Sequence, residues 1–150
     1  MRCVVQRVSR ASVTIDEKLC GSIQQGLLAL CGFENTDTTD ELLWMARKLI
    51  HLRIFNDAGG QMNLSLTDVA GGLLLVSQFT LHASTQKGKR PSFIKAARPE
   101  LAFALYQAFI EMCRQEYTGP VATGVFGANM QVELLNDGPV TIIIDSKNRE

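Results

Sequence analysis

Val and Ile recur near every second position through the first part of the chain. Residues 3–15 show this alternation, and a short apolar run at 27–31 follows Gly26. A period of two is typical of a strand with one buried and one solvated face. Because residues 16–18 have the composition of a turn, the pattern predicts a series of consecutive strands in this part of the chain.

A first helix is predicted after Thr38. Thr38 and Glu41 have the three-residue spacing of a capping box. Apolar residues then recur at helical spacing, at Leu42, Ala46, Leu49 and Ile50. The pattern indicates an amphipathic helix with a well-buried face.

A second helix is predicted to begin at Pro99, because proline is tolerated at the first helical position. It should end before Gly119-Pro120. Its expected buried face carries Leu101, Leu105, Phe109 and Met112.

The remaining apolar runs predict strands. One covers residues 73–76 and is expected to continue into the polar residues 77–81. Two more, at 130–135 and 140–144, surround the sequence Asn136-Asp137-Gly138-Pro139. Asp-Gly favours a hairpin turn there, although Pro139 removes a backbone donor from the strand that follows. Composition alone favours a trans Gly138–Pro139 peptide bond.

Clustered strands with only two helices favour an α+β domain on a mostly antiparallel sheet over a regular βαβ succession. The chain has 150 residues, of which 46% are hydrophobic, so we expect a single domain, 1–150, with a core that needs no disulfide or structural metal. The sequence contains neither of the glycine-rich phosphate loops, GxGxxG and GxxxxGK[ST].

Several functional classes are disfavoured by composition. No segment has the ~20 mostly apolar residues of a membrane span, and the first residues do not resemble a secretory signal, so a cytoplasmic protein is expected. The four cysteines are far apart, and the chain has only two histidines. We therefore expect reduced core thiols and no metal site. The cysteines are Cys3, Cys20, Cys31 and Cys113.

The formal net charge is zero, but the charges are unevenly distributed. Five cations and no acid lie between residues 86 and 98, which leaves 10 cations against 15 acids elsewhere. The five are Lys87, Lys89, Arg90, Lys95 and Arg98. Such a segment is either a solvated loop or a phosphate contact, and composition does not decide between them.

The polar residues after the apolar run at 73–76 are a candidate for chemistry. In an extended chain Gln78, Thr80 and His82 would share one face, so Thr80 could act as a nucleophile with His82 as its base. The simpler interpretation is a polar strand end whose hydroxyls bond the local backbone, and this interpretation is favoured.

Eight segments spread over essentially the whole chain resemble the D-aminoacyl-tRNA deacylases of the bacterial and eukaryotic type. The pair Ser-Gln-Phe-Thr and Gly-Pro-Val-Thr, at this separation, is specific to that family. The segments are Met1-Arg2, Gln6-Arg7-Val8, Ala11-Ser12-Val13, Asn63-Leu64-Ser65, Ser77-Gln78-Phe79-Thr80-Leu81, 87–93, 126–130 and 136–141.

The resemblance implies a sheet curled into a barrel-like form with two main helices, in a homodimer. It implies hydrolysis of the ester between a D-amino acid and tRNA, removal of glycine from tRNA(Ala), and no cofactor or metal. The partners would be the aminoacylated 3′ end of tRNA and a second copy of the chain.

The resemblance also assigns roles to residues. Ser77, Gln78, Phe79 and Thr80 would form the catalytic segment, in which the family's Thr80 is viewed either as a nucleophile or as a positioning residue. We favour positioning, because an unactivated threonine is a poor nucleophile, and we expect the backbone N–H groups near Phe79 and Thr80 to form the oxyanion site. Gly138-Pro139 would be cis, would enter the site of the partner to reject L-amino acids, and would be anchored by Arg7. The residues assigned to substrate or tRNA binding are Met130, Lys87, Lys89 and Arg90.

Three other functions stay open. One is the related animal-type deacylase that clears L-alanine from tRNA(Thr), whose Gly-Pro is trans and against which Phe79 argues. The second is a tRNA-binding or structural dimer without catalysis. The third is a general esterase that uses Thr80 and His82.

Overall fold

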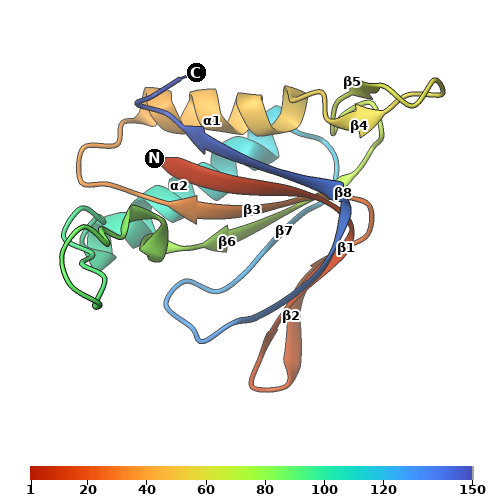
Figure 1. Ribbon diagram of the computed structural model, residues 1–150. Coiled ribbons are helices and arrows are strands. Elements are labelled where there is room, and N and C mark those ends of the chain that lie inside the picture. The colour runs from red at the N-terminus through yellow and green to blue at the C-terminus, as the bar shows by residue number, and fades with distance from the viewer. Residues whose placement is uncertain (150) are drawn as a thin grey trace.

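The computed structural model describes residues 1–149 (Figure 1). Strands and helices follow one another in the order β1, β2, β3, α1, β4, β5, β6, η1, α2, β7, β8. Their bounds are β1 Arg2–Ile15, β2 Lys18–Ile23, β3 Gly26–Gly32, α1 Thr39–His51, β4 Phe55–Asn56, β5 Met62–Leu64, β6 Gly72–Ser77, the 3-10 turn η1 Phe79–His82, α2 Pro99–Glu116, β7 Val121–Thr123 and β8 Gln131–Asp145.

Six of the strands form one mixed sheet, in the order β2-β1-β3-β6-β7, with β8 paired to β1. β1 is antiparallel to β2, β3 and β8, whereas β3–β6 and β6–β7 are parallel. In the sequence, α1 comes between β3 and β6, and α2 comes between β6 and β7. Each helix crosses over the sheet and returns the chain to the same end, so the strand that follows is parallel to the one before. The α+β class with two main helices is confirmed, and the two crossovers are βαβ units that the sequence did not predict.

The sheet buries both of its faces. Alternate residues of β3 and β6, such as Leu27, Ala29 and Leu75, pack against α1 and α2 in the larger core. Their neighbours Leu28 and Leu74 face the other way, into a second core with the far half of β1, with β2 and with β8. In Figure 1, β2 and the lower part of β8 swing below the sheet and cover this second face. The expected barrel-like curl is therefore present.

The helices are positioned largely as predicted. Thr38 and Glu41 form the complete capping box at the start of α1, and Pro99 is the first residue of α2. The predicted buried face of α2 is confirmed in part: Phe109 is buried and Leu105 and Met112 pack against the core, but Leu101 is 40% exposed. The face that packs on the sheet lies one residue later, because the helix begins with an exposed turn at the edge of a cavity; it consists of Ala102, Tyr106, Phe109, Ile110 and Cys113.

β8 corrects the prediction of a hairpin at Asn136-Asp137-Gly138-Pro139. Residues on both sides of this sequence pair with β1 in the same antiparallel direction: Thr141 lies opposite Gln6, and Asn136 lies opposite Val8. Residues 137–140 therefore bulge out of one continuous strand, opposite Arg7 alone. The long β1 provides a template on both sides of the bulge, and this continuous pairing takes precedence over the local turn preference of Asp-Gly.

The thiols are free, as expected, but they are not all in the core. Cys3, Cys31 and Cys113 are buried, whereas Cys20 is exposed. Cys20 lies in the outer half of β2, where residues 18–20 extend beyond the second core. None of the helices within residues 1–149 is long and apolar enough to cross a membrane.

Candidate active site

A cavity of about 710 Å³ opens where β6 ends. Its wall is formed by the end of β6, the first residue of η1, loop residues from 93–98, the start of α2 and the segment 126–132. The cavity brings together Ser77, Gln78 and Phe79 from the predicted catalytic segment with Met130 from the predicted binding residues. Met130 is about 50 residues away from the other three in the sequence. The tertiary fold therefore brings both predicted groups of residues to one cavity.

The chain turns sharply as it leaves β6. Ser77 is the last strand residue, the backbone N–H of Gln78 still donates to the carbonyl of Cys31 at 2.7 Å, and η1 then begins at Phe79. The predicted extension of the strand through residue 81 is therefore wrong. The side-chain amide of Gln78 donates to the Thr80 hydroxyl at 2.5 Å across this turn.

Because the chain turns, Thr80 and His82 do not share a face. Thr80 is exposed, whereas His82 is buried with its Nδ1 3.3 Å from a carboxylate oxygen of Glu34. The Nε2 atom of His82 has no hydrogen-bond partner among residues 1–149. The two side chains therefore form no Thr–His pair, and the general esterase loses its proposed base.

Free backbone donors and aromatic rings occur at the start of η1, where Phe79 and Phe93 line the cavity and Thr80 does not. The N–H groups of Phe79 and Thr80 lie at the start of η1, where a helical turn has no internal acceptors, and no acceptor for them occurs in the described part of the chain. The exposed ring of Phe79 packs edge to face against the ring of Phe93, with 5.0 Å between the two ring centroids. This arrangement offers hydrogen bonds to an oxyanion beside an aromatic surface to which a base could bind.

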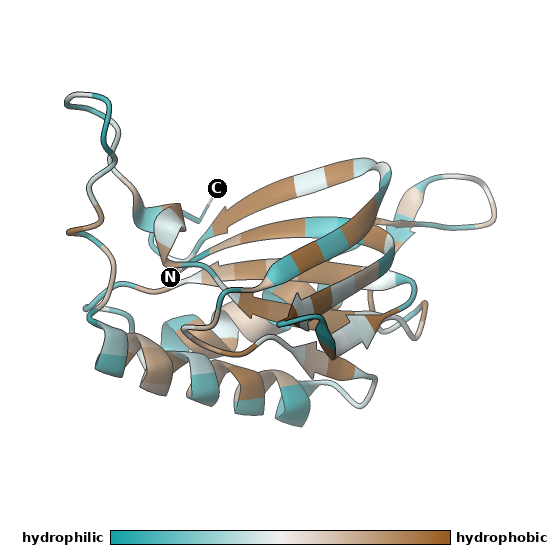
Figure 2. Ribbon diagram, turned by 90° about the horizontal axis from the view of Figure 1, so that it is seen from below, coloured by the Kyte–Doolittle hydropathy of each residue, from teal (hydrophilic) through white to brown (hydrophobic). Residues whose placement is uncertain are grey.

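The basic segment lies beside this cavity as a projecting loop. In Figures 1 and 2 the chain between η1 and α2 extends away from the body of the molecule, with a hydrophilic tip. Ser84 and Ser92 close the loop through two backbone hydrogen bonds of 2.8 and 2.9 Å. Lys87, Lys89 and Arg90 are exposed on it and do not line the cavity.

Gly138 and Pro139 are exposed in the bulge of β8, and the peptide bond between them is cis. This isomer agrees with the family resemblance and corrects the expectation from composition. Arg7 is buried and donates from Nε to the carbonyl of Asp137 at 3.0 Å and from Nη1 to the carbonyl of Ile54 at 2.6 Å. The predicted contact between Arg7 and the Gly-Pro loop therefore exists.

Asn136 is a part of this loop that the sequence did not single out. Its side-chain amide donates to the carbonyls of Arg7 and Val140, both at 3.0 Å, and so closes the base of the bulge. In the sequence, asparagine before Asp-Gly indicates only the composition of a turn. Its actual role depends on β1 lying opposite, which local sequence does not reveal.

None of residues 137–140 lines the cavity of its own chain. Arg7 holds the bulge, whereas Arg2, five residues earlier in β1, contacts Leu81 of η1. Five residues of extended strand span about 17 Å. No group of three or more His, Cys, Asp or Glu residues that could hold a metal occurs within residues 1–149.

Comparisons with known proteins agree with one another. A sequence model of the family described as D-Tyr-tRNA(Tyr) deacylase matches residues 4–145. The D-aminoacyl-tRNA deacylases of Flavobacterium psychrophilum and Akkermansia muciniphila are each 55% identical over 150 residues, which cover 100% of both chains compared.

Two solved structures share the fold. A structure titled c-Myc DNA unwinding element binding protein has a TM-score of 0.92 at 42% identity and covers 97% of this chain and 98% of that chain. A probable eukaryotic D-amino acid tRNA deacylase has a TM-score of 0.82 at 19% identity, over 95% and 97% of the two chains, and shows likeness of fold.

Proposed function

Because the chain belongs to the D-Tyr-tRNA(Tyr) deacylase family, we propose that the cavity beside η1 takes the aminoacylated 3′ end of tRNA. The protein is a D-aminoacyl-tRNA deacylase, a hydrolase that splits the ester between a D-amino acid and tRNA. The observation that carries the proposal is the convergence of Ser77, Gln78, Phe79 and Met130 on this one cavity. Aminoacyl-tRNA is made and used in the cytoplasm, where we place the reaction.

The chemistry needs few protein groups. An aminoacyl ester is already reactive, so holding it next to a water molecule and next to preorganised N–H donors provides much of the acceleration. The N–H groups of Phe79 and Thr80 are the donors in this proposal, and they receive the negative charge that develops on the carbonyl oxygen. The 2′-hydroxyl of the tRNA helps to activate the water.

Substrate choice depends on rejecting the abundant L-aminoacyl-tRNA, which attraction to the D form alone cannot achieve. In the proposal, Gly138 and Pro139 present backbone oxygens where an L side chain would have to lie. None of residues 137–140 lines the cavity of its own chain, and Arg2, which contacts η1, lies about 17 Å along β1 from Arg7, so in the proposal a second copy of the chain delivers them. This supports a homodimer in which each Gly-Pro bulge enters the cavity of the other protomer.

Glycine has no side chain on either side of its α-carbon, so a filter of this kind does not recognise it as L or D. We therefore include glycyl-tRNA(Ala) among the substrates. The exposed cations of the loop, Lys87, Lys89 and Arg90, are proposed to meet the phosphates of the acceptor stem.

The test is to measure hydrolysis of D-Tyr-tRNA, L-Tyr-tRNA and Gly-tRNA(Ala) by the unmodified protein. Fast release of D-tyrosine and glycine with slow release of L-tyrosine is the expected result. Release of L-alanine from tRNA(Thr) in place of D-tyrosine would favour the animal-type activity. Binding of tRNA without any release would favour the binding protein.

Thr80→Val tests whether the Thr80 hydroxyl is a nucleophile. Because it accepts from Gln78 and no base contacts it, we expect the variant to keep turnover within about tenfold of the unmodified protein, the loss of one positioning contact. Single-turnover rates on D-Tyr-tRNA measure this directly. Complete loss of turnover with tRNA binding intact would show that Thr80 attacks the ester.

A further inference from the structure

We propose that Arg2 and Asp145 are positioning residues for the reaction: together they hold η1, the turn that carries Phe79 and Thr80, in the orientation in which its N–H groups meet the ester. The inference deepens the function proposed above and rests on it. It assigns a task to two residues, at the start of β1 and the end of β8, that lie outside the cavity.

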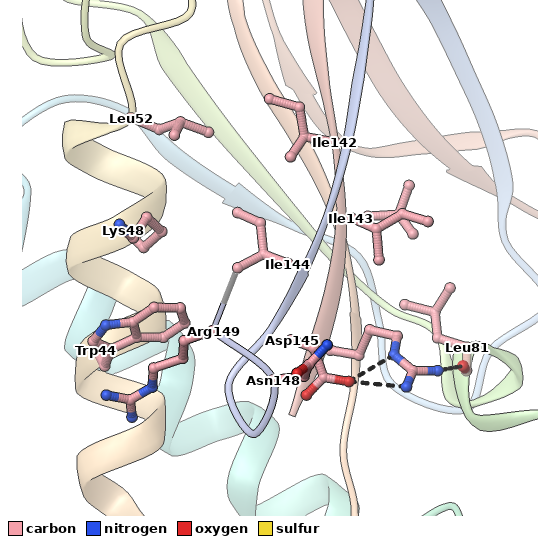
Figure 3. A pocket seen from close by; sticks show the side chains of 12 residues that line it. Trp44, Lys48, Leu52, Leu81, Ile142, Ile143, Ile144, Asp145, Asn148 and Arg149 are labelled. Carbon is pink, nitrogen blue, oxygen red and sulfur yellow. Dashed lines mark hydrogen bonds and ion pairs between the residues drawn. The ribbon is translucent and has the colours of Figure 1, made fainter.

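Arg2 connects the end of β8 to the turn. Its Nε and Nη2 atoms both donate to Oδ2 of Asp145, at 3.0 and 2.9 Å, and its Nη1 atom donates to the carbonyl of Leu81 at 2.8 Å. Figure 3 shows these contacts as dashed lines that run from Asp145 through the guanidinium to Leu81. The carboxylate fixes the plane of the guanidinium, so the third donor points at one place in η1.

Asp145 is itself held in place. The backbone N–H of Lys147 donates to its Oδ1 atom at 2.9 Å, so each carboxylate oxygen has its own donor. Partial burial works against the charge on this carboxyl, but the Lys147 N–H and the Arg2 guanidinium outweigh that cost and keep its pKa below the ordinary value. The carboxylate therefore stays ionised throughout the neutral range.

The other side of η1 is also fixed, and the same end of the chain contributes. His82, the last residue of η1, is buried against Gly32, with its Nδ1 3.3 Å from Glu34. The Glu34 carboxylate in turn lies 3.3 Å from the ammonium group of Lys147. Residues 145–147 thus reach η1 by two routes, through Arg2 and through Glu34.

The turn needs such support because it has little of its own. η1 has four residues, and its first residue is preceded by Gln78 without any side-chain cap. Short 3-10 turns have poor internal hydrogen-bond geometry, so their orientation depends on neighbours. A displacement of about 1 Å at a reacting group can cost about 100-fold in rate, so a contact to Leu81 can matter for catalysis without touching the substrate.

Asp145→Asn is the most specific test. The amide oxygen can still accept from Lys147, but an NH₂ group then takes the place of the oxygen that accepts from Arg2. We expect kcat on D-Tyr-tRNA to fall between about tenfold and 100-fold, with KM and the preference for D over L unchanged. Arg2→Gln should reduce kcat similarly, and the double variant should be no slower than either single one, because both remove the same contact.

Arg2→Lys asks whether charge alone suffices. A lysine can pair with Asp145, but its ammonium group lacks the planar fork that reaches two partners in fixed directions. We expect this variant to stay slow. Recovery of the full kcat by lysine would show that a simple ion pair is enough and would overturn the positioning role of the guanidinium.

Glu116→Gln is the matched control. Arg47 and Glu116 also form a two-bond arginine–carboxylate ion pair, at 2.8 and 3.2 Å, but it joins α1 to α2 and has no bond to η1 among residues 1–149. The control should have the same kcat as the unmodified protein and the same melting temperature as Asp145→Asn.

Each other outcome counts against the inference. The inference is overturned if Asp145→Asn has an unchanged kcat, or if only its KM is raised. It is also overturned if the melting temperature of Asp145→Asn, or its molecular mass in solution, is well below that of Glu116→Gln. If the unmodified protein releases no D-tyrosine, the proposed function itself fails, and η1 then has no reaction to serve.

Discussion

Gly138→Ala is expected to remove most of the discrimination between D- and L-aminoacyl-tRNA. A Cβ atom at this position would lie 2.8 Å from Nη2 of Arg7 and 2.9 Å from Cγ2 of Val140, and the φ of 129° is one that side-chain-bearing residues rarely adopt. Either the bulge or the Arg7 guanidinium that holds it must therefore shift, so the position of the Gly-Pro backbone changes. Since discrimination by shape is worth about 10- to 200-fold, we expect the ratio of D to L hydrolysis to fall by roughly that amount.

Gly60→Ala is the control for this prediction. Gly60 also has a positive φ, of 78°, but a Cβ atom added there would have no other atom within 4 Å. The substitution carries the same type of backbone cost, about 1 kcal/mol, without a clash and far from the bulge. The check is to measure the hydrolysis rates of both variants on D-Tyr-tRNA and on L-Tyr-tRNA. An unchanged ratio of the two rates in Gly138→Ala would show that the Gly-Pro bulge does not select the substrate.

Replacing Lys87, Lys89 and Arg90 together with glutamine should raise KM by at least about tenfold at low salt. All three are exposed on the projecting loop. Each phosphate contact contributes about 0.7 to 0.9 to the slope of log affinity against log salt, so losing three should flatten that slope by about 2 to 3. The D-to-L ratio should not change, because these three side chains do not line the cavity in which the amino acid is proposed to lie.

A second triple variant controls for net charge. Lys18, Arg47 and Arg114 are exposed cations on β2, α1 and α2, and their replacement with glutamine removes the same three charges away from the loop. KM measured across a range of salt concentrations should be close to that of the unmodified protein. Equal effects from the two triples would make the loop an ordinary solvated surface.

Local patterns in the sequence correctly predicted the features that depend on interactions between neighbouring residues. The capping box of Thr38 and Glu41 and the first-turn proline at Pro99 are properties of a few adjacent residues, and both were confirmed. The buried face of α2 was displaced by one residue because Leu101 lies beyond the area that the sheet covers. Amphipathic spacing gives the period of a helix better than the exact direction of its buried face.

The candidate site was less predictable from spacing. An extended chain would put Thr80 beside His82, but the turn after Ser77 sends His82 into the interior next to Glu34. Likewise Asp137-Gly138 has the residue types that favour a hairpin turn, and yet β1 continues past it and keeps both halves of β8 in one direction. In both cases a distant segment of the chain determined the outcome.

The bulge of β8 also bears on solubility. Within the described residues β8 pairs only with β1, so its other side is a free edge of the sheet, where unpaired N–H and C=O groups invite strands of other molecules and thereby aggregation. Pro139 has no N–H to offer, and residues 137–140 are displaced from the ladder. The edge is thus cut into two short stretches, 131–136 and 141–145. The bulge whose Gly138 and Pro139 we assign to choosing the substrate therefore also limits the growth of a continuous sheet from one molecule to the next.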